Sequence, residues 1–165
     1  LLLNHPGIKA VILGNEYDYF DPGNTTYIPW ENQNPKTMAM FIKDSINIIK
    51  TLKPDVEIVI GAPYNPATAL EPLVYEMAQI QVPIGQVVYA VHAYQDIENL
   101  NTKLNSTWRV LDKYVIPRRI WISELGALGS ETQQENLTQM IELAFNEGAG
   151  NVCLYHASAH DGFGF

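Results

Sequence analysis

Two glutamates each stand close behind a short apolar segment, and their side chains could share one chemical task. Glu16 follows the segment Lys9–Leu13, and Glu124 follows the segment Ile120–Ser123. A pair of carboxylates suits the hydrolysis of a glycosidic bond, because one protonates the leaving oxygen while the other attacks the anomeric carbon or activates water. Their surroundings must then hold one group as an acid and the other as a base at the working pH.

Polar and aromatic residues accompany these glutamates and also follow the other apolar segments. Binding sites for small molecules are lined by aromatic side chains and by a few polar groups that fix orientation. Aromatic residues are unusually frequent in the loop behind Glu16, where they could stack on sugar rings. The candidate substrate-binding residues are Asn15, Tyr17, Trp30, Tyr64, His92, Tyr94, Tyr155 and His156.

The elements that must position these residues alternate along the chain. Short apolar runs, which predict strands, occupy Lys9–Leu13, Glu57–Ile60, Val87–His92, Ile120–Ser123 and Val152–Tyr155. Stretches with apolar residues at helical spacing occupy Pro35–Leu52, Ala67–Gln79, Ile97–Tyr114 and Thr132–Asn146. Asn34 before Pro35 predicts a capped start of the first helix. Gly148 and Gly150 predict the end of the last helix.

The spacing of apolar residues also predicts the core. One face of the first helix would bury Met38, Phe41, Ile42, Ile46 and Ile49. One face of the third helix would bury Leu100, Leu104, Trp108 and Leu111. The single cysteine, Cys153, lies in an apolar run and is expected to be a small core residue.

Alternating strands and helices are typical of parallel βα units, and two α/β architectures fit. An open doubly wound sheet gathers its ligands at one switch point, often over a glycine-rich loop, and the chain has no such loop. In a (β/α)8 TIM barrel every strand can offer a residue at its C-terminal end, as every predicted strand does here. A whole barrel needs about 250 residues. We therefore expect residues 1–165 to form a single domain, the C-terminal portion of a barrel with three βα units upstream.

Three motifs resemble the glycoside hydrolases of clan A, the 4/7 superfamily of retaining barrel glycosidases. "LGNE" at Leu13–Glu16 is similar to the Asn-Glu pair that ends the fourth strand in that clan. "VHAY" at Val91–Tyr94 is similar to the His-x-Tyr of its sixth strand, and "IWISELG" at Ile120–Gly126 to the end of its seventh. The resemblance covers the whole chain as strands four to eight. It implies that Glu16 is the general acid/base and Glu124 the nucleophile.

The same resemblance implies a retaining glycoside hydrolase that cleaves β-linked glycans by double displacement. Asn15 would hydrogen-bond the 2-hydroxyl of the sugar, an interaction that strengthens in the transition state. Tyr94 would donate a hydrogen bond to Glu124 and hold it ionised, and His92 would line the same subsite.

One departure from the clan keeps a second function open. Clan A barrels often carry a tryptophan at the end of strand eight, whereas Val152–His160 offers Tyr155 and His156. The alternative is a catalytically inactive glycan-binding or structural surface protein with a glycosidase-like barrel. The presence of both Glu16 and Glu124 favours the enzyme.

Single residues could also have simpler, structural roles. Asn15 and the two glutamates could belong to ordinary solvated loops, His92 and Tyr94 could be packing residues, and Trp30 could anchor its loop. Asp18 and Asp21 could join Glu16 in a calcium site, and His156, His160 and Asp161 could bind zinc, but neither spacing matches a usual metal site. We therefore expect no metal and no cofactor.

Charge and composition restrict the partners. The formal net charge is −8 and the ten Lys and Arg residues are scattered, which argues against nucleic acid. No apolar run approaches the roughly 18 residues of a membrane span. Asn-x-Ser/Thr triplets at Asn24, Asn105 and Asn136 indicate a secreted, glycosylated protein, although a cytoplasmic location stays open. The expected partner is an oligo- or polysaccharide, with other chains or an N-terminal part of the barrel as further partners.

Overall fold

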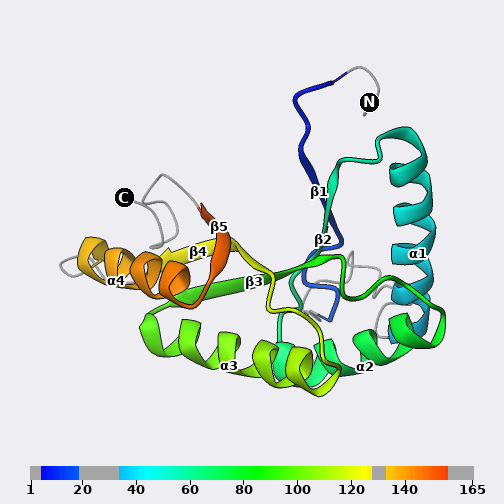
Figure 1. Ribbon diagram of the computed structural model, residues 1–165. Helices are drawn as coiled ribbons and strands as arrows, with labels where there is room; N and C mark the ends of the chain where they lie inside the picture. The colour runs from blue at the N-terminus through cyan, green and yellow to red at the C-terminus, as the bar shows by residue number, and fades with distance from the viewer. Residues whose placement is uncertain (1–4, 19–33, 128–132, 156–165) are drawn as a thin grey trace, which may run out of the picture. The chain divides into compact units, whose positions relative to one another are not determined.

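The computed structural model describes residues 5–18, 34–127 and 133–155, and in them five strands alternate with four helices (Figure 1). The strands are β1 (Ala10–Leu13), β2 (Glu57–Ile60), β3 (Val88–Gln95), β4 (Ile120–Ala127) and β5 (Ala149–Leu154). The helices are α1 (Pro35–Leu52), α2 (Pro66–Gln79), α3 (Ile97–Lys113) and α4 (Gln133–Asn146). The predicted alternation is confirmed: nine of the eighteen boundaries match the prediction, eight differ from it by one to three residues, and the end of β4 differs by four.

The chain divides into two compact units, Leu1–Val88 and Tyr89–Phe165. In the first unit β1 pairs in parallel with β2, and α1 packs against α2. In the second unit β3 pairs in parallel with β4 and β4 with β5, while α4 packs against β4, β5 and α3. None of the described helices is long and apolar enough to cross a bilayer.

Asparagine caps begin the two helices of the first unit. The side chain of Asn34 accepts a hydrogen bond from the backbone N–H of Lys36 at 3.0 Å, and proline holds the first helical position, as predicted. Asn65 does the same for α2, accepting from the N–H of Ala67 at 3.1 Å. In both helices an asparagine followed by proline therefore fixes where the helix starts.

The predicted buried faces of α1 and α3 are confirmed with one exception. The four expected residues of α3 and four of the five in α1 are buried. The prediction that Phe41 is buried is wrong, because this residue is 40% exposed. Ala39 is fully buried instead. The buried face of α1 is centred between Met38 and Ile42, and at 100° per residue Phe41 lies at its margin.

Two strands run farther than their apolar segments. β3 continues to Gln95 and β4 to Ala127, so that Tyr94 and Glu124 lie inside strands rather than behind them. The prediction ended each strand where the apolar residues end. The hydrogen-bonded ladder needs only backbone groups, and it continues through polar residues whose neighbours remain buried.

The prediction for the end of the chain is also corrected. Gly148, with φ of +87°, follows α4 as expected, but Gly150 belongs to β5. Cys153 is half-buried and not a core residue. In the described part of the second unit β5 pairs only with β4, so its residues have fewer neighbours than those of β4, which pairs on both sides.

Candidate active site

The loop behind β1 holds Glu16 in an uncommon backbone conformation. Glu16 has φ of +39°, in the left-handed region that residues other than glycine rarely enter. Its backbone N–H donates a hydrogen bond to the carbonyl of Ala62 at 2.8 Å, in the loop behind β2. Asn15 is exposed, and Glu16 and Tyr17 are half-buried. The loop therefore presents Asn15 and Glu16 at the carboxyl end of β1, where the sequence pattern predicts them.

Two glycines let the loops behind β1 and β2 approach each other closely. A Cβ atom on Gly61 would collide with the backbone carbonyl of Gly14, and the N–H of Gly61 donates to the carbonyl of Leu13 at 2.8 Å. Gly14 itself has φ of +84°, and a Cβ there would collide with the side chain of Met38. Tyr64, half exposed, lies in the second of these adjoining loops, so the first unit gathers the predicted residues of both strands.

Asp18 joins the same two loops through its side chain. Its carboxylate accepts hydrogen bonds from the backbone N–H groups of Tyr64 and Asn65, the latter at 2.8 Å. The calcium hypothesis gave these oxygens to a metal, whereas here backbone amides engage both of them. Sequence reasoning missed this contact, although an acid two residues behind Glu16 and an Asn-Pro helix start were signals for it.

In the second unit Glu124 is the centre of a polar cluster. The hydroxyl of Tyr94 donates a hydrogen bond to Oε2 of Glu124, and Nε2 of His92 lies 3.5 Å from Oε1. His92 is 4% exposed, whereas the Glu124 side chain retains 25% exposure. The carboxylate is thus held by two neighbours from β3 and remains open to solvent.

A β-bulge sets the register of this cluster. Val91 pairs with Ile122 and His92 with Glu124, so Ser123 is an extra residue in β4. Bulges of this kind redirect side chains and occur next to active sites. Farther along the same ladder Tyr94 pairs with Gly126. No local sequence signal marks the bulge, because it depends on the ladder with both neighbouring strands.

Two further residues fix Tyr94. The Tyr155 ring packs edge-on against the Tyr94 ring with centroids 5.3 Å apart, and its backbone N–H donates to the Leu125 carbonyl at 2.9 Å. The side chain of Asn99 accepts a hydrogen bond from the backbone N–H of Tyr94 at 3.1 Å. Tyr155 was predicted as a substrate-binding residue, whereas Asn99 was missed by sequence reasoning.

Comparison with solved structures decides the fold. A curdlan-specific exo-β-1,3-glucanase of glycoside hydrolase family 128 from Blastomyces gilchristii matches 91% of the chain with a TM-score of 0.64 at 16% identity. An endo-β-1,4-mannanase from Thermotoga petrophila matches 99% with a TM-score of 0.61 at 14% identity. An endo-β-1,4-glucanase from Xanthomonas axonopodis pv. citri matches 94% with a TM-score of 0.56 at 15% identity. The chain has the fold of part of a (β/α)8 barrel, similar to the barrels of these three enzymes.

The predicted fold class is thereby confirmed. The chain spans 62% of the length of the exo-glucanase, 41% of the mannanase and 66% of the endo-glucanase. No protein-family model and no curated protein sequence matches it. In barrels of this fold the active site lies at the carboxyl ends of the strands. Every candidate residue that the structure describes lies in the carboxyl-terminal half of its strand or in the following loop.

Some predicted members of the barrel site stay predictions. Trp30 and His156 lie outside the described residues, as do Asp21 and the histidines of the zinc hypothesis. Glu16 belongs to the first unit and Glu124 to the second, so the pairing of the two carboxylates also stays a prediction.

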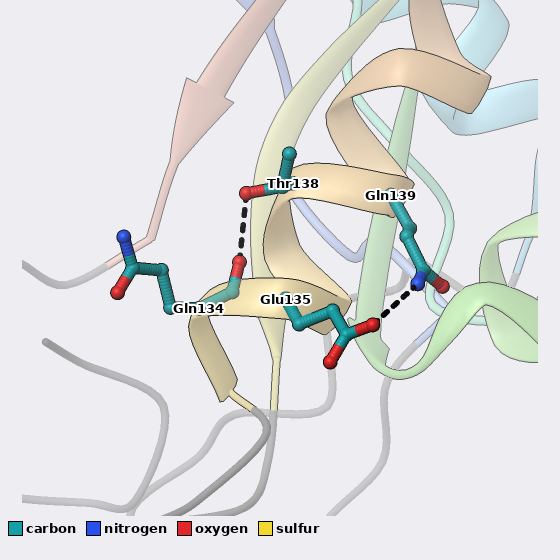
Figure 2. A pocket seen from close by; sticks show the side chains of 4 residues that line it. All are labelled: Gln134, Glu135, Thr138 and Gln139. Carbon is teal, nitrogen blue, oxygen red and sulfur yellow. Dashed lines mark hydrogen bonds between the residues drawn. The ribbon is translucent and has the colours of Figure 1, made fainter.

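A separate hollow lies on the surface of α4 and does not belong to this site. It has a volume of about 410 Å³ and is lined by Gln134, Glu135, Thr138 and Gln139 (Figure 2). The Thr138 hydroxyl donates to the Gln134 carbonyl at 2.8 Å, and the Gln139 amide donates to Glu135 at 3.4 Å. These are bonds along a single helix, and none of the predicted site residues lines the hollow.

Proposed function

We propose that the protein containing this chain is a retaining glycoside hydrolase that cleaves β-linked glycans through Glu16 and Glu124. The cluster around Glu124 carries the proposal: a carboxylate open to solvent accepts a hydrogen bond from Tyr94 and lies 3.5 Å from His92. A carboxylate held by a hydroxyl donor keeps a fixed direction, which suits a nucleophile. The barrel fold and the Asn-Glu pair behind β1 support the same function.

The reaction would run in two steps that conserve atoms and charge. In the first, a carboxylate oxygen of Glu124 bonds to the anomeric carbon while the bond to the leaving oxygen breaks. Glu16 gives its proton to that oxygen. In the second, Glu16 takes a proton from a water molecule, whose oxygen bonds to the anomeric carbon and releases Glu124. Two inversions at the same carbon leave its configuration unchanged.

Other residues would bind the sugar around the reacting carbon. Asn15 would hydrogen-bond the 2-hydroxyl, and its exposure at the carboxyl end of β1 leaves its amide accessible. The half-exposed ring of Tyr64 is available to stack on a sugar. Tyr17, Trp30, Tyr155 and His156 complete the proposed set, in which Tyr155 also supports Tyr94.

A 2-deoxy-2-fluoro-β-glycoside with a dinitrophenyl leaving group tests the nucleophile directly. The fluorine slows the second step, so the full protein should accumulate one covalent sugar, and peptide mass mapping should place it on Glu124. Gluco, manno and xylo versions would report the accepted sugar. Glu124→Gln should not be labelled, and Glu57→Gln, at the start of β2, should be labelled like the parent.

A glycan-binding protein without activity would give a different result. It would form no ester with any fluoro-sugar, yet calorimetry would still detect a bound β-glucan or β-mannan oligosaccharide. A label on a residue other than Glu124 would contradict the assignment of the nucleophile.

Secretion with N-glycosylation is the second part of the proposal. Asn105 is exposed on α3, whereas Asn136 on α4 is half-buried. Release of glycans by an amidase, followed by mass spectrometry of protein from a eukaryotic host, should show modification at Asn105 before Asn136. An unmodified chain from a secreting host would contradict this part.

A further inference from the structure

The carboxylate of Asp18 connects the loop that carries Glu16 to the start of α2. Oδ1 accepts the N–H of Tyr64 and Oδ2 accepts the N–H of Asn65, at 2.8 Å. Asn65 is the residue that caps α2. One side chain therefore attaches the loop behind β1 to two successive amides of the loop behind β2.

The charge of Asp18 suits this position. The first N–H groups of a helix and those just before it carry partial positive charge and have no partner within the helix. A carboxylate that receives two such N–H groups makes charge-assisted hydrogen bonds, which are stronger than bonds between neutral groups. An asparagine could accept only one of these two bonds, because its amide nitrogen is a donor.

Hydrogen bonds to the loop behind β2 hold the chain at Glu16 and again at Asp18. The N–H of Glu16 donates to the carbonyl of Ala62 at 2.8 Å, and Asp18 binds the same loop two residues later. Between them the backbone of Glu16 holds φ of +39°. A residue other than glycine keeps such a conformation only where several contacts impose it.

We infer that Asp18 is a positioning residue for the general acid Glu16, and this inference rests on the proposed function. Asp18 fixes the backbone from which the Glu16 side chain extends toward the leaving oxygen. Without it the loop relaxes from its left-handed turn, and the proton of Glu16 no longer lies in line with that oxygen. Asp18 itself touches neither the sugar nor the reacting atoms in this arrangement.

Substrates whose leaving groups differ in acidity distinguish a misplaced general acid from a general loss of structure. Dinitrophenolate leaves the sugar without receiving a proton, whereas the leaving oxygen of an alkyl glycoside or a natural linkage needs one. Asp18→Ala should lower kcat/KM about ten- to hundredfold on the alkyl glycoside and less than threefold on the dinitrophenyl glycoside, because general acid catalysis supplies about 10²- to 10⁴-fold. Asp18→Asn should fall between Asp18→Ala and the parent.

Asp55→Ala is the matched control, because Asp55 is an exposed acid of the same unit just before β2, away from the carboxyl ends of the strands. Its kcat/KM should match the parent on both substrates. An equal loss on both substrates in Asp18→Ala, or no loss on either, would overturn the positioning role. Glu16→Ala tests the proposed function separately: if it shows no dependence on the leaving group, Glu16 is not the acid.

Amide hydrogen exchange gives a readout that needs no activity. In Asp18→Ala the peptide that contains Tyr64 and Asn65 should exchange faster, and so should the peptide around Glu16, while peptides of α3 should be unchanged. Faster exchange at Tyr64 with unaltered exchange around Glu16 would show that Asp18 only caps α2. That result would also overturn the inference.

Discussion

Tyr94 is the best-supported single residue of the candidate site. Its hydroxyl binds Glu124, its ring packs against Tyr155 and its backbone N–H binds Asn99. The sequence could predict the first contact, because the motif around His92 and the motif around Glu124 occur in neighbouring strands. It could not predict the other two, since they depend on where α3 begins and on the pairing of β4 with β5.

Tyr94→Phe removes the hydroxyl and keeps the ring. We expect kcat on an activated aryl glycoside to fall about ten- to hundredfold, because a hydrogen bond to a charged group contributes about 1.5–3 kcal/mol. Steady-state kinetics measures the fall, and thermal unfolding checks that the protein remains folded. The ring contact with Tyr155 should survive, so a large loss of stability without a change in kcat would contradict the role given to the hydroxyl.

At the scale of elements, the sequence predicted what depends on local chemistry. Asparagine followed by proline predicts a helix start, and the cap of α1 forms as expected. Apolar spacing predicts buried helix faces, apart from Phe41 at the margin of one. The bulge at Ser123 and the length of β4 were not predictable, because they arise from pairing with β3 and β5 rather than from β4 itself.

The cap of α1 can be tested by itself. Asn34→Ala should lower the free energy of unfolding by about 1 kcal/mol, because it leaves the N–H of Lys36 without its side-chain acceptor. Urea denaturation measures the change. Asn34→Ser retains a capping oxygen and should recover most of the loss; equal stability of the alanine and serine variants would show that the cap contributes nothing.

The end of α3 provides a test of pH dependence. Asp112 accepts hydrogen bonds from Nε and Nη2 of Arg118, at 3.0 and 2.6 Å, and these bonds lower the pKa of Asp112 below its usual value. A pKa that is lower in the folded state stabilises the fold above the unfolded pKa, which is about 3.9. This contribution disappears as the pH falls through the lower folded pKa.

Arg118→Leu should therefore destabilise the protein more at pH 7 than at pH 2. The guanidinium also lies 5.0 Å from the ring of Trp108, but loss of that contact does not vary over this range and leaves the difference between the two pH values unaffected. Because both charges are exposed, the difference should be small and should shrink in 1 M salt. Denaturant midpoints at each pH measure it, and an equal destabilisation at both values would contradict the role of Asp112.

At the scale of the whole molecule, charge is distributed unevenly along the chain. All ten Lys and Arg residues lie in helices or ahead of strands, and residues 14–34, 61–65, 128–132 and 155–165 contain none. Glu16, Asp18 and Asp96 follow strands, and Glu124 lies in the carboxyl-terminal half of β4. The fold class was predictable at this scale, because alternating strands and helices suffice for it. The pairing of Glu16 with Glu124 stays a prediction, because it depends on how distant strands are arranged in space.

This charge distribution predicts a preference for neutral glycans. A carboxylated polysaccharide would bring negative charge to the acidic carboxyl ends of the strands, and the net charge of −8 adds a repulsive field around the protein. At low salt, kcat/KM for a carboxymethylated β-glucan should lie well below that for the neutral glucan of the same linkage. Raising the ionic strength from 0.01 M to 1 M shortens the Debye length from about 30 to 3 Å, so the charged substrate should improve while the neutral one stays constant. A preference for the charged glucan at low salt would require a cationic group at the site that the sequence does not place there.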